Sequence, residues 1–280
     1  MTPTRFLPDL YEPVIRWLLG EIAAHASATY LLGIHGAQGT GKTTLAELLR
    51  CYLRDEQDCS VVCISIDDFY LTRQDRQSLA ASVHPLLATR GPPGTHDIDL
   101  ALQTIQTVRT LAVGESAKMP KFDKAIDDRA PESKWPTVNG PVDLLILEGW
   151  CVGSEPAEPG SLLEPVNDLE RDEDQDGDWR RFVNDSLENY QPLFGQIDGL
   201  LMLRPPGFET IFEWRLKQER ELQQSNPEDS DRIMSETELR RFIQLFERLT
   251  LASDATVGEK ADVVVQLGID HQPVSVGKTR

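Results

Sequence analysis

A glycine-rich segment, residues 36–43, constrains this chain more than any other feature of its sequence. The segment fits G-x-x-x-x-G-K-[ST], the P-loop pattern whose backbone N–H groups surround the phosphates of a nucleoside triphosphate. A short apolar run, residues 30–35, precedes it, and from Leu45 onward apolar side chains recur at i, i+3, i+4 and i+7. A buried strand, a glycine-rich turn and an amphipathic helix are the context that the motif requires. A flexible turn without a ligand is therefore the weaker interpretation.

The chemistry of the P-loop assigns a role to each kind of residue in it. The three glycines permit positive φ angles and a close approach of the backbone to a phosphate. Lys42 is expected to reach the β- and γ-phosphates of ATP, and the Thr43 hydroxyl is expected to bind Mg²⁺. The residues expected to bind the nucleotide are consecutive: Gly36, Ala37, Gln38, Gly39, Thr40, Gly41, Lys42, Thr43 and Thr44.

Length and charge narrow the class of protein. The 280 residues suffice for a single α/β domain, and the net charge of -18 disfavours nucleic acid or an anionic membrane surface as a partner. No apolar run approaches about 18 residues and no basic-then-apolar start is present, which favours a cytoplasmic protein. The four cysteines lack C-x-x-C spacing, and three of them lie on or near predicted core elements and are expected to be buried apolar residues rather than ligands. Nothing in the sequence predicts the oligomeric state.

Acidic side chains follow two of the predicted strands. The β-rich run 60–66 ends at Asp67 and Asp68, and the apolar run 142–147 ends at Glu148. In open α/β sheets, ligands bind outside the carboxyl ends of the strands. Asp67 is therefore a candidate general base for an attacking hydroxyl, with capping of a turn or helix as the alternative, whereas Asp68 is expected to cap or support. Glu148 fits the acid that holds Mg²⁺ in P-loop proteins, and a purely structural acid is the alternative.

The loops between these strands contain several polar and charged side chains that could contact a ligand. Two prolines and two glycines in residues 91–94 predict a fixed loop, flanked by Arg90 and His96, and Thr95 or Asp97 is expected to cap the next helix.

Residues 112–141 are expected to be irregular, and they hold a small basic group consisting of Lys118, Lys121, Lys124 and Arg129. A solvated loop balanced by its own aspartates and a site for an anionic substrate or for phosphate oxygens explain this group equally well.

The second half of the chain adds further strands and two charged segments. Apolar runs at 199–203 and 261–267 predict a fourth and a fifth strand. Residues 153–180, which include the acidic segment 164–178, are expected to form a solvated loop. Residues 208–224 predict a charged helix containing Arg215, which is either a lid whose arginines contact phosphate or a solvent-exposed helix. The lid is expected within residues 205–235, and Ser235 with Glu238 has the spacing of a capping box at the next helix.

Segments that span most of residues 30–220 resemble one family of kinases. They are residues 36–44, 65–70, 84–87, 90–97, 120–124, 128–129, 135–136, 148–150 and 214–216. They are similar to the D-glycerate 3-kinase family of plants and cyanobacteria and to its fungal and bacterial kinase-like relatives. The Arg-Gly-x-Pro-Gly-Thr-His-Asp segment at 90–97 and the Phe-Asp-Lys segment at 122–124 resemble this family specifically. More distantly, the chain resembles the uridine kinase, phosphoribulokinase and pantothenate kinase group of P-loop kinases.

The resemblance implies a P-loop NTPase fold with a five-stranded parallel sheet in the order 2-3-1-4-5, helices on both faces and a helical lid. It implies ATP as donor and a hydroxyl as acceptor. Asp67 becomes the preferred base, and Arg215 becomes a contact of the phosphates. The residues that it makes candidates for contact with an anionic acceptor are Asp68, Tyr70, Arg90, His96, Lys121, Lys124 and Arg129.

The resulting hypothesis is a kinase that transfers the γ-phosphoryl group of ATP to D-glycerate, giving 3-phosphoglycerate. Asp67, Lys42 and Arg215 are its expected catalytic residues, and Thr43 and Glu148 are its expected Mg²⁺ ligands. One alternative is a kinase of the same fold that acts on another acceptor, such as a nucleoside or pantothenate. A second alternative is a nucleotide-dependent switch or ATPase without a small-molecule acceptor.

Overall fold

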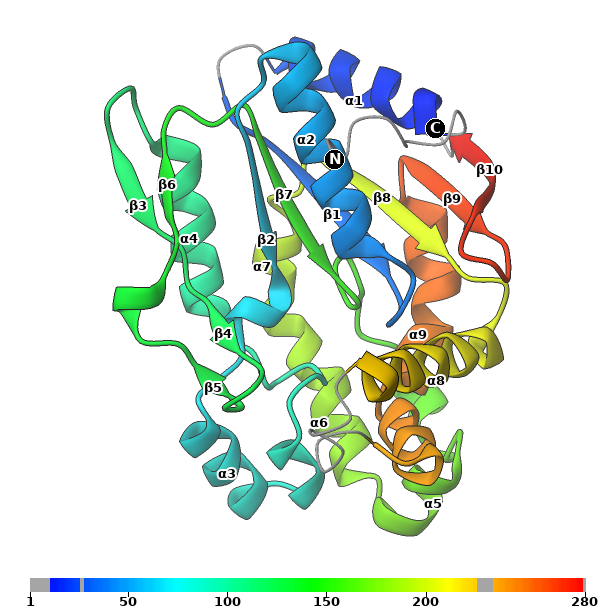
Figure 1. Cartoon of the computed structure of the whole chain (residues 1–280). Helices are drawn as coiled ribbons and strands as arrows, with labels where there is room; N and C mark the ends of the chain where they lie inside the picture. The colour runs from blue at the N-terminus through cyan, green and yellow to red at the C-terminus, as the bar shows by residue number, and fades with distance from the viewer. Residues whose placement is uncertain (1–10, 26–27, 226–233, 279–280) are drawn as a thin grey trace.

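A six-stranded sheet organises the part of the chain that the computed structural model describes, residues 11–25, 28–225 and 234–278 (Figure 1). Its strands, in chain order, are β1 (Tyr30–Gly36), β2 (Val61–Ser65), β7 (Leu144–Gly149), β8 (Gly199–Arg204), β9 (Val263–Leu267) and β10 (Pro273–Lys278). Every residue of β1 and of β7 is buried. Strands covered on both faces read as continuous apolar runs, which is why the sequence reveals them clearly.

The predicted sheet of five strands is wrong in its strand count. The order is β10-β9-β8-β1-β7-β2, so the five expected strands are parallel neighbours and a sixth strand follows at the edge. The added strand, β10, pairs antiparallel with β9 and is mostly exposed. Backbone pairing rather than apolar burial holds it, so hydrophobic periodicity carries no signal for it.

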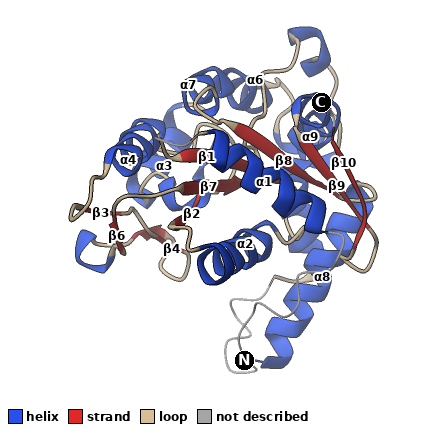
Figure 2. Ribbon diagram, turned by 90° about the horizontal axis from the view of Figure 1, so that it is seen from above, coloured by secondary structure: helices blue, strands red, loops and turns tan. Residues whose placement is uncertain are grey.

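Helices cover both faces of the sheet (Figure 2). Their bounds are α1 Glu12–Ala24, α2 Lys42–Gln57, α3 Arg73–Ser82, α4 Ile98–Thr110, α5 Asp168–Glu173, α6 Asp178–Ser186, α7 Gln191–Phe194, α8 Phe208–Ser225 and α9 Glu236–Lys260. Side chains alternate across each strand, and β7 illustrates the result. Leu144 and Ile146 pack with α1 and α2, whereas Leu145 and Leu147 pack with α4, α7 and α9. The central strands are thus fixed between two apolar layers.

Several local predictions about helices and cysteines are confirmed. Asp97 caps α4 by accepting from Leu100 N, and Ser235 with Glu238 forms a capping box at α9. The cysteines are free and wholly or partly buried. The apolar stripe within residues 8–27 predicts a helix near the N-terminus, and α1 is that helix, although residues 8–10 and 26–27 of the prediction lie outside the described residues. In the described part of the chain, no helix combines the length and apolarity needed to cross a membrane.

The loop 112–141 is more regular than predicted. It contains two small antiparallel pairs, β3 (Ser116–Lys118) with β6 (Thr137–Asn139), and β4 (Phe122–Asp123) with β5 (Asp128–Arg129). These strands are only two or three residues long, too short to produce a readable alternation. The β4–β5 hairpin, residues 122–129, carries part of the basic group into the interior of the site described below.

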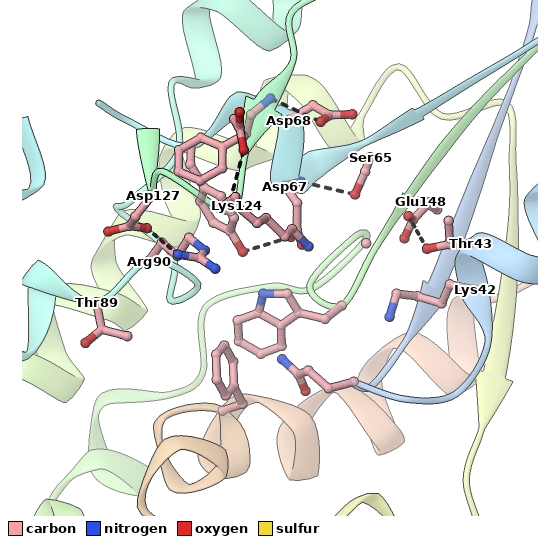
Figure 3. Close-up of a pocket in the computed structure, with 18 of the residues that line it drawn as sticks. Lys42, Thr43, Ser65, Asp67, Asp68, Thr89, Arg90, Lys124, Asp127 and Glu148 are labelled. Atoms are coloured by element: carbon pink, nitrogen blue, oxygen red, sulfur yellow. Dashed lines mark hydrogen bonds and ion pairs between the residues drawn. The ribbon is translucent and has the colours of Figure 1, made fainter. Parts of the chain in front are cut away.

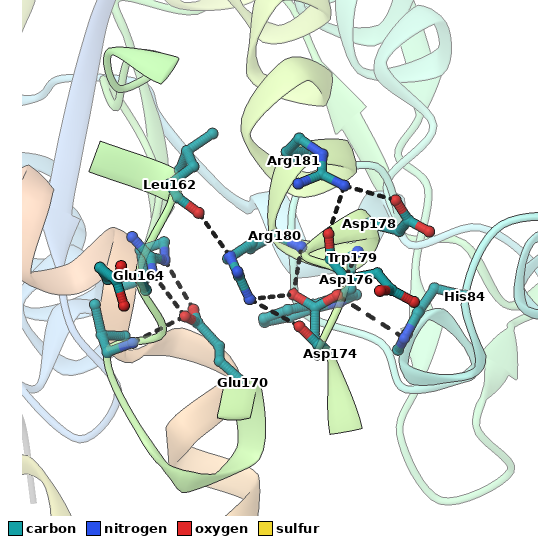
Figure 4. A network of polar contacts seen from close by, with 12 residues as sticks. His84, Leu162, Glu164, Glu170, Asp174, Asp176, Asp178, Trp179, Arg180 and Arg181 are labelled. Atoms are coloured by element: carbon teal, nitrogen blue, oxygen red, sulfur yellow. Dashed lines mark hydrogen bonds and ion pairs between the residues drawn. The ribbon is translucent and has the colours of Figure 1, made fainter. Parts of the chain in front are cut away.

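The acidic segment 164–178 is only partly the solvated loop that its composition predicts, because most of its acids are exposed but it contains α5 and two of its acids are buried. Glu170, on α5, is fully buried, and Arg248 of α9 contacts both of its carboxylate oxygens, at 2.8 and 2.6 Å. Asp174 is also buried, and it accepts from the backbone N–H groups of Trp179 and Arg180 and from the Arg180 guanidinium (Figure 4). Buried carboxylates need such partners, and one of the partners lies 78 residues away in sequence. Local charge density cannot reveal it.

The predicted lid, residues 205–235, lies only partly within the described residues. Helix α8 lies inside it, whereas residues 226–233 lie outside the described residues. Apolar residues of α8 and α9 form a small cluster of their own, with Phe212 packed on Leu239 and Ile243. The first residues of α8 are thereby held next to α9, with Arg215 one turn further along the helix.

Candidate functional site

The P-loop joins β1 to α2 as the sequence predicts. Gly39 and Gly41 have φ angles of 78° and 85°, values that favour glycine. Gly36 has no positive φ, and close packing explains it instead, because a Cβ there would lie 2.7 Å from Thr40 Oγ1. The loop ends at Lys42, the first residue of α2, so the N-terminus of a 16-residue helix faces the site. Such an N-terminus presents unpaired N–H groups to an anion.

Lys42, Thr43 and Glu148 converge beside this loop. The Lys42 ammonium donates to Ala37 O at 3.0 Å, and burial lowers its pKa although Glu148 and Asp67 raise it. Thr43 Oγ1 donates to Glu148 Oε1 at 2.8 Å. Glu148 is buried, and the parallel pairing of β7 places it beside Ile34 of β1 and Ser65 of β2. The acid at the end of β7 is therefore in contact with the P-loop threonine.

The oxygen atoms of Thr43 and Glu148 fit a magnesium ion. Mg²⁺ prefers hard oxygen ligands, and in nucleotide sites it usually takes one or two from the protein and the rest from phosphates and water. Among the described residues, no group of three or more His, Cys, Asp or Glu side chains could hold a metal. A site built from one hydroxyl and one carboxylate matches the nucleotide-dependent kind of binding.

Asp67 lies in a 3₁₀ helix, Ile66–Phe69, directly after β2. Its two carboxylate oxygens have different partners, since Lys124 Nζ lies 2.7 Å from Oδ2 and the Tyr70 hydroxyl donates to Oδ1 at 2.8 Å. Burial acts to raise the pKa of Asp67, but Lys124, with smaller contributions from His96 and Tyr70, lowers it below its ordinary value. Asp67 is therefore ionised at neutral pH and able to accept a hydrogen bond from a hydroxyl.

Asp68 has the supporting position that the sequence predicts. Its side chain is mostly buried, forms an ion pair with Lys121 at 3.0 Å and accepts from Phe122 N at 3.3 Å. The neighbouring aspartates thus bind the β4–β5 hairpin region at two points, Asp68 at its start and Asp67 at Lys124.

The hairpin also contacts Arg90 and Arg76, and no sequence pattern singled out Arg76. Asp127, at the hairpin turn, forms ion pairs with Arg90 and with Arg76 of α3, the latter at 2.9 Å. Arg76 is only 1% exposed. It lies in a short polar helix whose spacing carries no sign of burial, so only the tertiary structure reveals it.

His96 and Arg129 lie behind Tyr70 rather than in the lining of the cavity. The His96 ring stacks on Tyr70 with centroids 4.5 Å apart, and its Nδ1 lies 2.7 Å from the Tyr190 hydroxyl. Burial lowers the pKa of His96 to about 4, although Asp67 raises it. Arg129 donates to Tyr70 O and to Asp97. Contact of these two residues with an acceptor stays a prediction, and their positions favour the support of Tyr70.

Arg215 of α8 lies against the P-loop. A Cβ at Gly39 would come within 3.8 Å of Arg215 Cδ. The Arg215 guanidinium donates to Gln218 Oε1 at 2.7 Å and to Glu219 Oε1 at 2.6 Å. A cation thus lies beside the phosphate-binding loop, where the lid interpretation expects one.

One cavity of about 1290 Å³ connects the groups described above other than His96 and Arg129 (Figure 3). One part of the cavity is lined by the P-loop with Lys42 and Thr43, and by Glu148 and Arg215. Another part is lined by residues of the β4–β5 hairpin and by residues close to it in space: Asp67, Asp68, Tyr70, Arg76, Arg90, Lys121, Lys124 and Asp127. Trp150 and Phe246, whose rings meet edge-to-face with centroids 4.9 Å apart, form an aromatic wall. Trp150 lies in the family-like segment 148–150, whereas no sequence pattern predicted a role in the site for Phe246, because it also fits the apolar stripe of a helix.

Two D-glycerate 3-kinases and one uncharacterised kinase are among the known proteins that resemble the chain. It is 29% identical over 285 residues to the chloroplastic D-glycerate 3-kinase of Arabidopsis thaliana, a match that covers 94% of this chain and 59% of that protein. The structure of D-glycerate 3-kinase from Cryptococcus neoformans superposes with a TM-score of 0.81 at 25% identity, over 96% of this chain and 99% of that one. An uncharacterised kinase of Schizosaccharomyces pombe, mug58, is 36% identical over 200 residues, 69% of this chain and 71% of that protein.

The chain belongs to the family of P-loop kinases that contains mug58 and the D-glycerate 3-kinases. No family model matched the chain in a scan against models of known families. As a P-loop kinase, the chain uses its glycine-rich loop to bind a nucleotide, and the remainder of the cavity is available to a second substrate. A uridine kinase of Brevibacillus brevis is a more distant relative, 32% identical over 122 residues.

Proposed function

We propose that this kinase transfers the γ-phosphoryl group of ATP to a hydroxyl of D-glycerate, giving 3-phosphoglycerate and ADP. The observation that carries the proposal is the single cavity in which the P-loop, the Asp67 carboxylate and a set of fixed cations meet. Glycerate is small and anionic, and in a chain of net charge -18 a local group of cations is needed to bind it. Two relatives described as D-glycerate 3-kinases support the choice of acceptor.

On the donor side, the P-loop N–H groups and Lys42 hold the β- and γ-phosphates. Arg215 lies against the same loop and is the cation that we assign to the charge developing on the transferred group. Thr43 and Glu148 would hold Mg²⁺, which when bound neutralises charge on the phosphate oxygens. Each of these groups is fixed by the P-loop or by its neighbours before any substrate arrives.

On the acceptor side, Asp67 accepts a hydrogen bond from the attacking hydroxyl and orients it. The hydroxyl oxygen forms a bond to the γ-phosphorus as the bond from that phosphorus to the bridging oxygen breaks, and the bond electrons leave with ADP. The hydroxyl proton passes to the Asp67 carboxylate. The Tyr70 hydroxyl holds Oδ1 of Asp67 at 2.8 Å and Lys124 Nζ holds Oδ2 at 2.7 Å, which together fix the direction in which Asp67 can accept.

The proposal is tested by ADP formation in the presence of candidate acceptors. Purified protein with ATP and Mg²⁺ should release ADP slowly alone and at least about 100-fold faster with D-glycerate, since acceptor positioning dominates such reactions. Uridine, pantothenate and glycerol provide the comparison. Stimulation by uridine or pantothenate alone would point to another acceptor, and slow hydrolysis that no hydroxy compound accelerates would point to a nucleotide-dependent switch.

A further inference from the structure

The part of the cavity away from the P-loop holds an ion-pair group whose role the proposed chemistry leaves open. Arg76, Arg90 and Asp127 all line the cavity, and the Asp127 carboxylate forms ion pairs with both arginines. In Figure 3, Arg90 and Asp127 lie on the opposite side of Asp67 from Lys42 and Thr43. An acceptor whose hydroxyl lies at Asp67 would therefore extend its other end toward this group.

The two arginines differ in how firmly they are held. Arg76 is 1% exposed, and its three guanidinium nitrogens donate to backbone carbonyls, namely those of Leu71 at 3.3 Å, Ala88 at 2.8 Å and Asp127 at 2.7 Å. It would remain in place without the Asp127 carboxylate. The Arg90 side chain is 31% exposed, with its charge over the Phe122 ring and its donor NH1 directed to Asp127. Arg90 is thus the guanidinium whose partner can be exchanged.

Asp127 presents its carboxylate from a constrained backbone. Its φ angle of 54° is uncommon for a residue with a Cβ, and its own carbonyl is held by Arg76. The side chain is 36% exposed and borders the cavity. A planar guanidinium binds a carboxylate with matching geometry whether that group belongs to the protein or to a ligand.

We propose that Arg90 binds the carboxylate of the acceptor, and that Asp127 occupies this position until the acceptor arrives. Asp127 then keeps Arg76 as its ion-pair partner. The inference rests on the proposed function, and it names the acceptor class as a small hydroxy acid. An uncharged polyol cannot replace one carboxylate by another, so Asp127 makes the site selective against such compounds by leaving Arg90 paired with the protein.

Calorimetric titration of D-glycerate, with a non-hydrolysable ATP analogue and Mg²⁺ present, tests the exchange. Arg90→Gln should raise the Kd for D-glycerate by about 10- to 100-fold, the usual range for loss of a charge-assisted contact. Asp127→Asn should lower that Kd, because it removes the competing carboxylate and keeps the carbonyl bonded to Arg76. Arg73→Gln, which removes an exposed charge of α3, is the matched control, and thermal melts check that each variant is folded.

The two variants separate exchange from a structural role. An unchanged Kd in Arg90→Gln, or a raised Kd in folded Asp127→Asn, would overturn the proposal. If Asp127→Asn does not fold, the Arg90→Gln value decides, together with the absence of glycerol binding in the wild type. Wild-type protein that binds D-glycerate through Arg90 but forms no ADP with it would contradict the proposed function and leave the anion site supported. Absence of D-glycerate binding to the wild type would overturn both.

Discussion

At the scale of single residues, the site depends on carboxylates that have cationic partners. Asp67 is paired with Lys124, Asp68 with Lys121, and Asp127 with Arg90. The pairing keeps Asp67 ionised, which suits a residue that orients a hydroxyl, but it also makes Asp67 a weaker base. Lys124 therefore has a measurable influence on the acid side of the pH profile.

Substitution of Lys124 by Met should move the acid limb of kcat/KM to higher pH. In the proposed mechanism the active form of Asp67 is the carboxylate, so activity falls as the pH falls through its pKa. Lys124 lowers that pKa, and its removal raises it. Rates of ADP formation from about pH 3 to 8 measure the limb, because the pKa of Asp67 in the wild type lies below its ordinary value of 3.8.

Two further variants control this experiment. Lys134→Met removes a cation from the same cavity without a contact to Asp67 and should leave the limb in place. Asp67→Asn should reduce kcat by about 10²- to 10⁴-fold. A limb that Lys124→Met does not move would show that another group titrates there.

At the scale of elements, the buried acids of segment 164–178 attach α5 and α6 to the rest of the fold. Arg248 contacts the Glu170 carboxylate and also donates to the carbonyls of Ser161 and Glu164, at 2.7 and 2.6 Å. Helix α9 therefore carries both Arg248, which fixes this segment, and Phe246, which forms the cavity wall. Segment 164–178 is therefore linked through α9 to the wall of the cavity.

Substitution of Arg248 by Met should lower the free energy of unfolding by about 3–5 kcal/mol, because it leaves the fully buried Glu170 without its cation. Urea unfolding measures the change. Arg241→Met on the same helix breaks the exposed pair with Glu173 and should cost no more than about 1 kcal/mol. Equal losses in the two variants would mean that burial of Glu170 does not determine the cost.

At the scale of the whole molecule, two buried histidines couple folding to pH. His35 lies on β1 behind the P-loop and His96 lies behind Tyr70, and burial lowers the pKa of each to about 4. The ordinary value in an unfolded chain is about 6.5. Between these values the unfolded chain binds protons that the folded chain does not, so stability decreases as the pH falls.

The free energy of unfolding should therefore fall between about pH 6.5 and 4 by up to about 1.4 kcal/mol per pH unit for each histidine. Urea titrations at pH 7, 6 and 5 measure the slope. His96→Asn should reduce the slope by the share of one histidine, and His35→Asn should do the same. A slope that neither variant changes would assign the acid sensitivity to other groups.

The sequence alone was enough to predict the P-loop, the five parallel strands and the acids that follow two of them. The P-loop, the five apolar strands and the acids at Asp67 and Glu148 are local patterns, because a buried parallel strand needs a continuous apolar run and its end lies at the ligand edge of the sheet. The resemblance of segments 90–97 and 122–124 to one kinase family pointed to the acceptor.

Only the tertiary structure decided which charges meet. Nothing in the local sequence links Arg76 to Asp127 or Glu170 to Arg248, and the acidic composition of 164–178 does not reveal that two of its acids, Glu170 and Asp174, are buried while the others are exposed. The edge strand β10 is a similar case, since it is held by backbone hydrogen bonds to β9. Ion pairs and strand pairing between distant segments depend on three-dimensional proximity, and composition and periodicity describe only neighbours along the chain.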